Sequence, residues 1–268
     1  MFKKNKYKKF GLSRKEINKL KATNSFELTN LRFKNVDITI SNPFWFLHSV
    51  EELFIDEIYK FNSSVDNPVI IDCGANWGLS VIFFKGLYSD AEIIAYEPDP
   101  LIFKLLSKNI LNHGFNKVQL ENKAVWINNR ELSFSSDGGL GGSLTEIAIK
   151  KRDEVKIQAI RLKDVLGQYA EIEFLKIDIE GAEYEVIKDC KDNLSHVNYL
   201  FIEYHSAPNR DQKLDEILAI VRNAGFKYYI KEAWNNMEHP FEVHKNIYYD
   251  LQLNIFCYKS SDKTILDK

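Results

Sequence analysis

One short stretch constrains the fold of this chain more than any other, Val69–Leu87, which reads VIIDCGANWGLSVIFFKGL. It begins with a continuous β-branched run, which is typical of a parallel strand that is buried on both faces. Its second half repeats apolar residues at helical spacing, the pattern of a helix packed on a sheet. Gly74 and Gly78 bracket the turn between the two halves. The stretch therefore predicts a strand, a turn and a helix, an arrangement that points helix amides at a ligand in the crevice of an open parallel sheet.

The spacing of the two glycines indicates the kind of ligand. A dinucleotide fingerprint reads GxGxxG, because close glycines let a pyrophosphate approach the backbone. Here the glycines form GxxxG, and Asp72 precedes them. Such a turn suits a zwitterionic ligand better than a pyrophosphate, which disfavours a nicotinamide oxidoreductase.

Three further blocks follow in order along the chain, namely EPDP at 97–100, KIDIEGAE at 176–183 and IEYH at 202–205. Together with DCGANWG at 72–78 they resemble the FkbM-type family of S-adenosylmethionine-dependent methyltransferases, over roughly residues 69–207. The resemblance implies a class I methyltransferase (Rossmann-like) fold and S-adenosyl-L-methionine as the cofactor. It is more specific for the cofactor than for the acceptor.

The rest of the chain alternates strand-like and helix-like segments, which predicts a parallel sheet with right-handed crossovers. We expect an α/β domain over residues 67–268, with seven mostly parallel strands and helices on both faces. The expected strands after the first lie at 92–97, 118–125, 172–178 and 197–203, followed by a closing antiparallel pair at 226–230 and 251–258. Two strand-like pieces between 132 and 162 interrupt the alternation and flank a glycine-rich loop at 138–143. That loop is either a flexible connection or a lid that orders on substrate.

Residues 1–66 are expected to form an N-terminal α+β cap over the crevice. The patterns predict a helix from Ser13 to about Lys21, a hairpin over 26–40 and a helix over 50–61. Residues 1–16 carry seven lysines or arginines against one glutamate, with aromatic residues between them. This tail is either a loose, solvated terminus or a contact for an anionic membrane surface or a polyanionic substrate.

Composition narrows the remaining classes of function. The net charge is −2, which argues against a general nucleic-acid binder, so no nucleic-acid partner is expected. Three scattered cysteines predict a reduced, intracellular protein. The sequence contains no membrane span or signal peptide pattern. We expect a cytoplasmic location, with peripheral contact at the inner membrane face if the basic tail binds lipid.

The predicted cofactor residues lie in the turn and at the ends of the next strands. Asp72 is expected to bind the ammonium group of the cofactor, and the backbone of Gly74, Asn76 and Gly78 to accept its methionine part. Glu97 ends the second strand, where a carboxylate can accept both ribose hydroxyls. The family resemblance places the adenine edge at Ala124, where a small residue leaves room for the ring.

The predicted catalytic residues are Asp178, Glu203 and His205 at the ends of the fourth and fifth strands. Asp178, Glu180 and Glu183 place three acids within six residues, which repel each other unless a sulfonium, a lysine or a divalent metal lies among them. We assign Glu180 to the cofactor. Glu203 and His205, two residues apart on a strand, face the same side. His205 is then a candidate general base without a metal, although these three side chains also suit a hard divalent ion.

These features predict an O-methyltransferase in which a hydroxyl oxygen attacks the methyl group in line. The family resemblance implies a small-molecule or saccharide acceptor, most often in a surface polysaccharide or a related natural product. The alternative is methylation of a nucleic acid or of another small molecule. Residues 42–45 partly resemble the motif of amino methylases but lack its second proline. A non-catalytic binder would be expected to lack the strand-end acids. The oligomeric state is left open.

Overall fold

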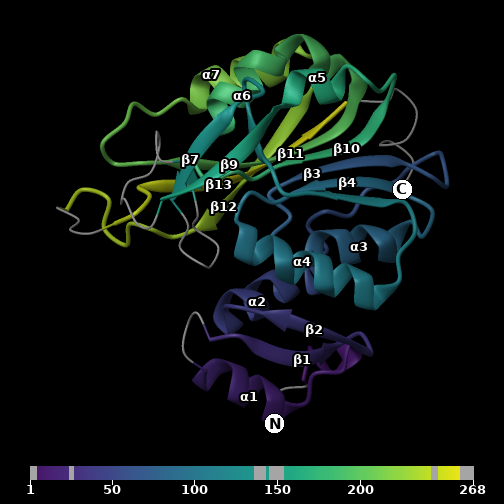
Figure 1. Ribbon diagram of the computed structural model, residues 1–268. Coiled ribbons are helices and arrows are strands. Elements are labelled where there is room, and N and C mark those ends of the chain that lie inside the picture. The colour runs from purple at the N-terminus through teal and green to yellow at the C-terminus, as the bar shows by residue number, and fades with distance from the viewer. Residues whose placement is uncertain (1–4, 24–26, 136–142, 145–153, 243–246, 260–268) are drawn as a thin grey trace, which may run out of the picture.

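A seven-stranded sheet forms the centre of the computed structural model, which describes residues 5–23, 27–135, 143–144, 154–242 and 247–259 (Figure 1). In spatial order the strands are β12 (Lys227–Trp234), β13 (Leu251–Tyr258), β11 (Val197–Ser206), β10 (Ile172–Ile177), β3 (Val69–Cys73), β4 (Glu92–Tyr96) and β5 (Val118–Glu121). The strands from β11 to β5 are parallel, and β13 is antiparallel to both of its neighbours. The predicted class I methyltransferase sheet and its closing antiparallel pair are confirmed.

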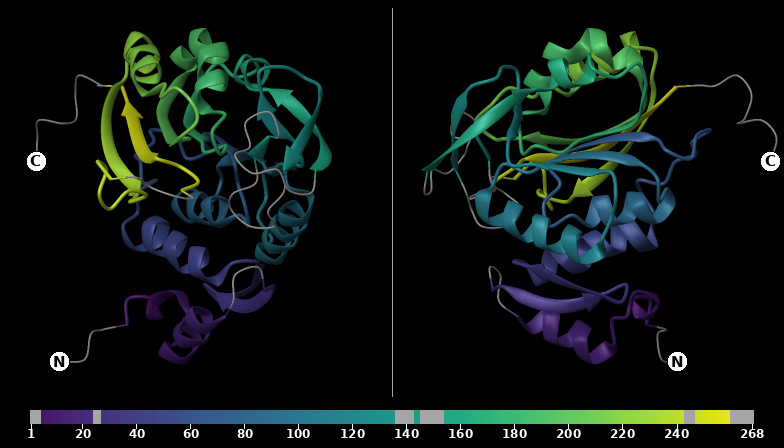
Figure 2. Two further views of the ribbon diagram at one scale, coloured as in Figure 1. Left: turned by 90° about the vertical axis from the view of Figure 1, so that its left-hand side faces the viewer. Right: turned by 45° about the vertical axis from the view of Figure 1, so that its right-hand side comes forward.

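Helices cover both faces of this sheet, as predicted (Figure 2). One face carries α5 (Leu162–Leu166), α6 (Glu183–Cys190), the 3-10 helix η3 (Lys191–His196) and α7 (Leu214–Asn223), and the other carries α3 (Leu79–Leu87) and α4 (Pro100–His113). Alternation along β3 explains the two layers, since Ile71 joins one hydrophobic cluster and Ile70 the other. Among the described residues, no helix combines the length and hydropathy that crossing a membrane requires.

The N-terminal part adds a further layer below α3 and α4 (Figure 1). It consists of η1 (Lys8–Phe10), α1 (Arg14–Ala22), β1 (Thr29–Phe33), β2 (Val36–Ile40), α2 (Pro43–Val50) and the π-helical turn η2 (Glu51–Ile55). The predicted first helix is confirmed, with Ser13 and Glu16 forming a capping box. The predicted hairpin is confirmed too, and both turn residues, Lys34 and Asn35, have positive φ values of 49° and 67°.

Tyr7 and Phe10, the aromatic residues in the described part of the basic tail, belong to the core. Phe10 is 7% exposed, and its ring centroid lies 5.7 Å from that of Phe33 and 5.6 Å from that of Phe54. The expectation of a loose terminus is therefore wrong for the described part of this tail, whereas Lys8 and Lys9 remain exposed. The hydrophobic cluster runs without a break from these residues to the central sheet. The domain boundary at residue 66 stays a prediction.

The helix expected over residues 50–61 is displaced. In the structure α2 begins at Pro43, and the helix continues as a π turn only to Ile55. The side chain of Asn42 accepts a hydrogen bond from the N–H of Trp45 (3.3 Å). The prediction is wrong because Asn42 and Pro43 supply an N-cap and a first-turn proline, so the helix begins before the apolar spacing from which it was expected.

The single strand expected over 118–125 is also wrong, because the chain changes sheets there. β5 ends at Glu121, and β6 (Ala124–Trp126) pairs instead with β9 (Glu154–Arg161). β7 (Glu131–Ser135) and β8 (Ser143–Leu144) complete this small sheet, which confirms the predicted β insertion. The side chain of Asn122 holds the break by donating to the carbonyl oxygens of Glu97 and Pro98. Apart from Ser143, the glycine-rich loop lies outside the described residues.

Candidate active site

A cavity of about 420 Å3 lies at the carboxyl ends of β3, β4, β10 and β11. This is where open parallel sheets bind ligands. Its lining comes from α2 and η2, the loops after β3, β4 and β10, the end of β11, the small sheet, and the segment between β12 and β13. Most of the predicted site residues line it, namely Gly74, Asn76, Glu97, Ala124, Asp178, Glu180 and Glu203.

The turn after β3 touches the loop after β10. Gly74 has a φ of 94°, and a Cβ atom at this position would lie 1.9 Å from the carbonyl oxygen of Asp178. Gly78 also has a positive φ of 91°, and a Cβ there would lie 2.8 Å from the end of the Leu106 side chain, which would have to shift. Only glycine fits both the backbone conformation and the space at position 74. The two halves of the site therefore meet through the main chain.

Glu97 is anchored by the backbone at the cavity wall. Its Oε2 accepts the N–H of Asn76 (2.9 Å), and its Oε1 accepts the N–H of Asp99 (2.9 Å). Burial raises the pKa of Glu97 to about 8, because it disfavours the charged form more than the two backbone donors favour it. The carboxyl is thus held in one orientation with its charge poorly compensated, which suits it to accept hydrogen bonds from ligand hydroxyls.

Asp72 lies beneath the cavity and does not line it. It is fully buried and accepts a hydrogen bond from the hydroxyl of Ser80. Its Oδ1 is 3.4 Å from Nζ of Lys176, which in turn donates to the carbonyl oxygen of Gly74 (2.8 Å) and to Asp178 (3.0 Å). This placement fits an indirect role, in which Asp72 holds the lysine that orients the turn and Asp178. The expected binding of the cofactor ammonium by Asp72, directly or through water, stays a prediction.

Ala124 starts β6 and lines the cavity beside Val125 and Phe134 of the small sheet. All three side chains are buried. They form an apolar wall near Glu97, which also lines this cavity. A contact between Ala124 and the adenine ring stays a prediction.

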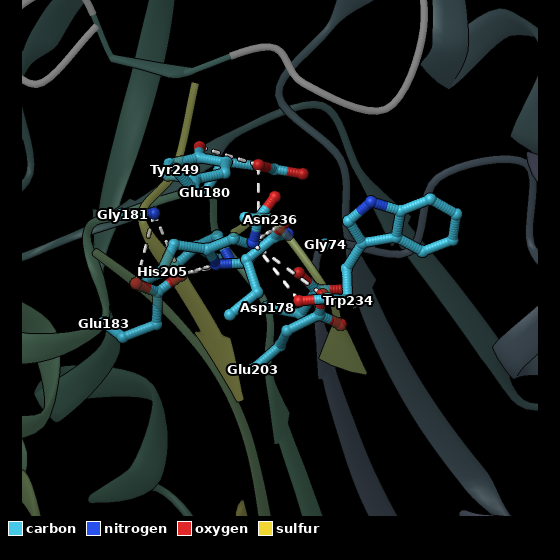
Figure 3. Close-up of polar contacts among 12 residues, drawn as sticks. Gly74, Asp178, Glu180, Gly181, Glu183, Glu203, His205, Trp234, Asn236 and Tyr249 are labelled. Carbon is cyan, nitrogen blue, oxygen red and sulfur yellow. Dashed lines mark hydrogen bonds and ion pairs between the residues drawn. The ribbon is translucent and has the colours of Figure 1, made fainter. Parts of the chain in front are cut away.

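His205 lies behind the cavity, inside a cluster of carboxyl groups (Figure 3). Its Nδ1 is 3.1 Å from Oε1 of Glu183, and its Nε2 is 3.5 Å from Oε1 of Glu203 and 3.7 Å from Oε2 of Glu180. The ring of Tyr249 lies 4.8 Å away, and its hydroxyl donates to Glu180 (2.9 Å). The side chain of His205 is 1% exposed and does not line the cavity.

The surroundings of His205 favour its charged form. Burial by itself lowers the pKa of the imidazole, but the negative charges of Glu180 and Glu183, with hydrogen bonds to Glu183 and Glu203, raise it well above its ordinary value. A group that holds its proton tightly cannot accept another at neutral pH. The arrangement fits a positioning residue for Glu180 and Glu203 better than the general base expected from the sequence.

The structure brings Asp178, Glu203 and His205 together, as the sequence predicts. Each offers one possible ligand atom, and these atoms lie within 4.8 Å of one another. A divalent ion here would need a neutral His205. The metal-free assignment stays a prediction.

Sequence reasoning missed one pair in the cavity wall, His48 and Glu52. His48 lies on α2 and Glu52 one turn later in η2, with Nδ1 of the imidazole 3.2 Å from Oε2 of the carboxylate. Both line the cavity, as do Trp45 and Trp234 beside them. The sequence does contain a signal for this pair, a histidine and a glutamate at spacing i, i+4. It was missed because the helix was expected over residues 50–61, which leaves His48 outside it.

The comparison with protein families fits this geometry. A model of the methyltransferase FkbM domain matches residues 72–228, which is more than half of the chain. The chain belongs to the FkbM methyltransferase family. The match begins at the end of β3 and ends in β12, so the FkbM domain contains Glu97, Asp178 and the His205 cluster. It does not include α2 and η2, which contribute His48 and Glu52.

Similar proteins include other FkbM-type enzymes. Methyltransferase sdnD of Sordaria araneosa is 32% identical over 171 residues, which cover 52% of this chain and 66% of sdnD. The 31-O-demethyl-FK506 methyltransferase FkbM of Streptomyces tacrolimicus is 25% identical over 209 residues, 65% of this chain and 79% of that protein. A crystal structure of methyltransferase FkbM from Methylobacillus flagellatus KT matches with 19% identity and a TM-score of 0.46, over 73% of this chain and 45% of that one. The chain thus spans only part of sdnD and of that solved chain.

Proposed function

We propose that this protein is an S-adenosyl-L-methionine-dependent O-methyltransferase that acts on a hydroxyl of a sugar or glycan. The observation that carries the proposal is a single cavity with a backbone-anchored acid, Glu97, in one part of its wall and the strand-end acids Asp178 and Glu203 in another. Family membership and an O-methylating relative named for FK506 support methyl transfer to oxygen.

The residues around Glu97 fit the cofactor. The Glu97 carboxyl can accept hydrogen bonds from the two ribose hydroxyls, and the turn from Gly74 to Gly78 brings the main chain close to the ligand. Ala124 gives the adenine ring an apolar wall. When bound, S-adenosyl-L-methionine supplies an electrophilic methyl group on a positively charged sulfur. The carboxyls of Asp178 and Glu180 stabilise that charge.

The acceptor part of the cavity combines rings and acids. Trp45 and Trp234 line it, with ring centroids 5.0 Å apart, and Asp178 and Glu203 line it as well. Aromatic faces pack on the C–H faces of sugars, and carboxylates accept hydrogen bonds from their hydroxyls. Lys176 and His205 fix the two carboxylates, so the protein contributes positioning at low reorganisation cost.

A methyl-transfer screen tests the proposal. The full chain is incubated with S-adenosyl-L-methionine labelled in the methyl group and with nucleotide sugars, glycolipids and free oligosaccharides. We expect base-stable label on at least one saccharide, because a methyl ether resists mild alkali and a methyl ester does not. Glu97→Ala, which removes the ribose acceptor, is the matched control and should incorporate less label at a limiting concentration of S-adenosyl-L-methionine.

Two results would contradict the proposal. If S-adenosylhomocysteine does not bind the protein in calorimetry, the cofactor assignment fails. If it binds but label enters only RNA, DNA or an amine, the cofactor assignment stands and the hydroxyl acceptor is wrong.

A further inference from the structure

Methyl transfer to a hydroxyl requires a group that accepts the hydroxyl proton. The identity of this group is inferred here on the basis of the proposed function. The best general base has a pKa near the working pH and faces the cavity. His205 fails the second condition because it lies behind the carboxyls. Lys176 fails as well, since the charges of Asp178 and Asp72 outweigh its burial and hold it protonated.

His48 is the only histidine among the described residues that line the cavity. It projects from α2, and its side chain is 30% exposed. The indole rings of Trp45 and Trp234 lie 5.4 Å and 5.5 Å from it, centroid to centroid, and flank the ring. His48 is therefore accessible to a ligand and restricted in rotation at the same time.

Glu52 determines which nitrogen of His48 is free. The carboxylate Oε2 lies 3.2 Å from Nδ1, so in the neutral imidazole the proton is held on Nδ1 and the lone pair is on Nε2. The π turn of η2 places Glu52 one turn after His48, and π turns of this kind are frequent at functional sites. A carboxylate that orients an imidazole in this way is the arrangement that activates histidine bases in other enzymes.

The charges that face His48 come from two elements. The hydrogen bond to Glu52 raises the pKa of His48, burial opposes it, and the charges of Glu52, Glu203 and Glu51 raise it further. Glu52 and Glu51 belong to η2 and Glu203 to β11, while the packed ring of Trp234 from β12 is uncharged. An imidazole with a modestly raised pKa can still release and accept a proton near neutral pH.

We propose that His48, oriented by Glu52, is the general base that accepts the proton of the acceptor hydroxyl. The hydroxyl oxygen forms a bond to the methyl carbon while the carbon–sulfur bond breaks, and that electron pair remains on sulfur. The proton moves to Nε2 of His48. The positive charge lost from sulfur reappears on the imidazolium, next to the Glu52 carboxylate that stabilises it. The catalytic base thus comes from outside the matched FkbM domain.

The first test needs no acceptor. The Cε1 proton of His48 is titrated by NMR in the full chain with S-adenosylhomocysteine present, and its signal is assigned by its loss in His48→Gln. We expect a pKa above that of a free histidine and a proton on Nδ1 in the neutral form. Glu52→Gln should lower that pKa, since it removes an opposite charge within contact distance. Glu57→Gln is the matched control, because Glu57 follows η2, pairs with Lys60 and does not line the cavity.

The second test uses the saccharide that turns over fastest in the screen. We expect His48→Gln to lower kcat by about 10²-fold or more without changing the affinity for S-adenosylhomocysteine, and to abolish the acidic limb of the pH–rate profile. Glu52→Gln should move that limb to lower pH, and Glu57→Gln should not move it.

The outcomes separate this proposal from the proposed function. Methyl transfer that survives in His48→Gln with an unchanged pH profile overturns the base assignment and leaves the methyltransferase in place. A His48 that titrates identically in Glu52→Gln overturns the role of Glu52. Absence of methyl transfer to any hydroxyl by the wild-type protein overturns the proposed function itself. Calorimetry with S-adenosylhomocysteine identifies variants that have lost their fold.

Discussion

The main chain at Gly74 lies so close to the carbonyl oxygen of Asp178 that a single added carbon would come within 1.9 Å of it. This contact joins the turn that we assign to the cofactor to the loop that carries the acids of the acceptor side. Lys176 reinforces it by donating to both Gly74 and Asp178. The geometry of the whole site therefore depends on a glycine at position 74.

Gly74→Ala should destabilise the protein and weaken cofactor binding. The strain of a positive φ contributes about 1 to 3 kcal/mol, and the clash with Asp178 adds to it. Gly225→Ala is the matched control, because Gly225 has a φ of 89° and open space around it. Thermal unfolding should show a clearly larger loss for Gly74→Ala. Equal losses in the two variants would mean that the close contact is unimportant.

Glu97→Ala should weaken S-adenosylhomocysteine binding at least about tenfold, because it removes a pair of charge-assisted hydrogen bonds.

In the wild type the affinity for S-adenosylhomocysteine should rise from pH 6 to pH 9, since the pKa of Glu97 is raised to about 8 and the ionised form accepts ribose hydroxyls best. Glu121→Gln serves as the control, as Glu121 ends the neighbouring strand and does not line the cavity. Calorimetry at several pH values measures both effects. A pH-independent affinity in the wild type would contradict the role of Glu97.

His205→Gln should destabilise the fold at pH 6, because it leaves the buried carboxyl of Glu183 and the half-buried carboxyls of Glu180 and Glu203 without their cation. The pKa of His205 is raised in the folded state above the unfolded value of 6.5. Its stabilisation is therefore complete below pH 6.5 and is lost as the pH rises through the folded value. Urea unfolding of wild type and variant at pH 6 and pH 9 measures this. A difference that grows toward pH 9 would exclude a protonated His205.

Treatment with EDTA should leave methyl transfer unchanged. Lys176 and the imidazolium of His205 already offset the acids that would otherwise bind a divalent ion. Rates are measured with the best acceptor after chelation and gel filtration. Loss of activity with recovery on Mg2+ or Mn2+ would establish a metal at Asp178, Glu203 and His205, and His205 would then be neutral.

Lys8→Glu combined with Lys9→Glu tests the contact with an anionic membrane surface, one of the alternatives for the basic tail. Both lysines are exposed, so reversal of their charge should leave the fold intact and reduce binding to vesicles that contain phosphatidylserine. Deleting residues 1–10 is unsuitable, because it removes Phe10 from the aromatic core, and loss of a buried phenylalanine destabilises by about 3 to 5 kcal/mol. Co-sedimentation that is equal in wild type and variant would exclude a role for these lysines.

The sequence by itself determined the elements whose signals are local. The β-branched run before Asp72, the glycines after it and the helical spacing up to Leu87 indicate strand, turn and helix within a few residues, and all of them lie as predicted. The same reasoning located Glu97, Asp178 and Glu203 at one edge of the sheet, because parallel strands end together.

Tertiary structure decided which of the predicted site residues at the strand ends face the cavity and which are buried behind it. Glu203 and His205 lie on the same face of β11. The strand continues past Glu203, however, and His205 pairs with Gln252 of β13, so the imidazole of His205 is enclosed. Asp72 precedes the turn but is buried under Lys176. The approach of α2 to β11 and β12, which brings His48 into the site, joins residues more than 150 positions apart. No local pattern encodes such packing, because it depends on which surfaces remain to be buried once the sheet has formed.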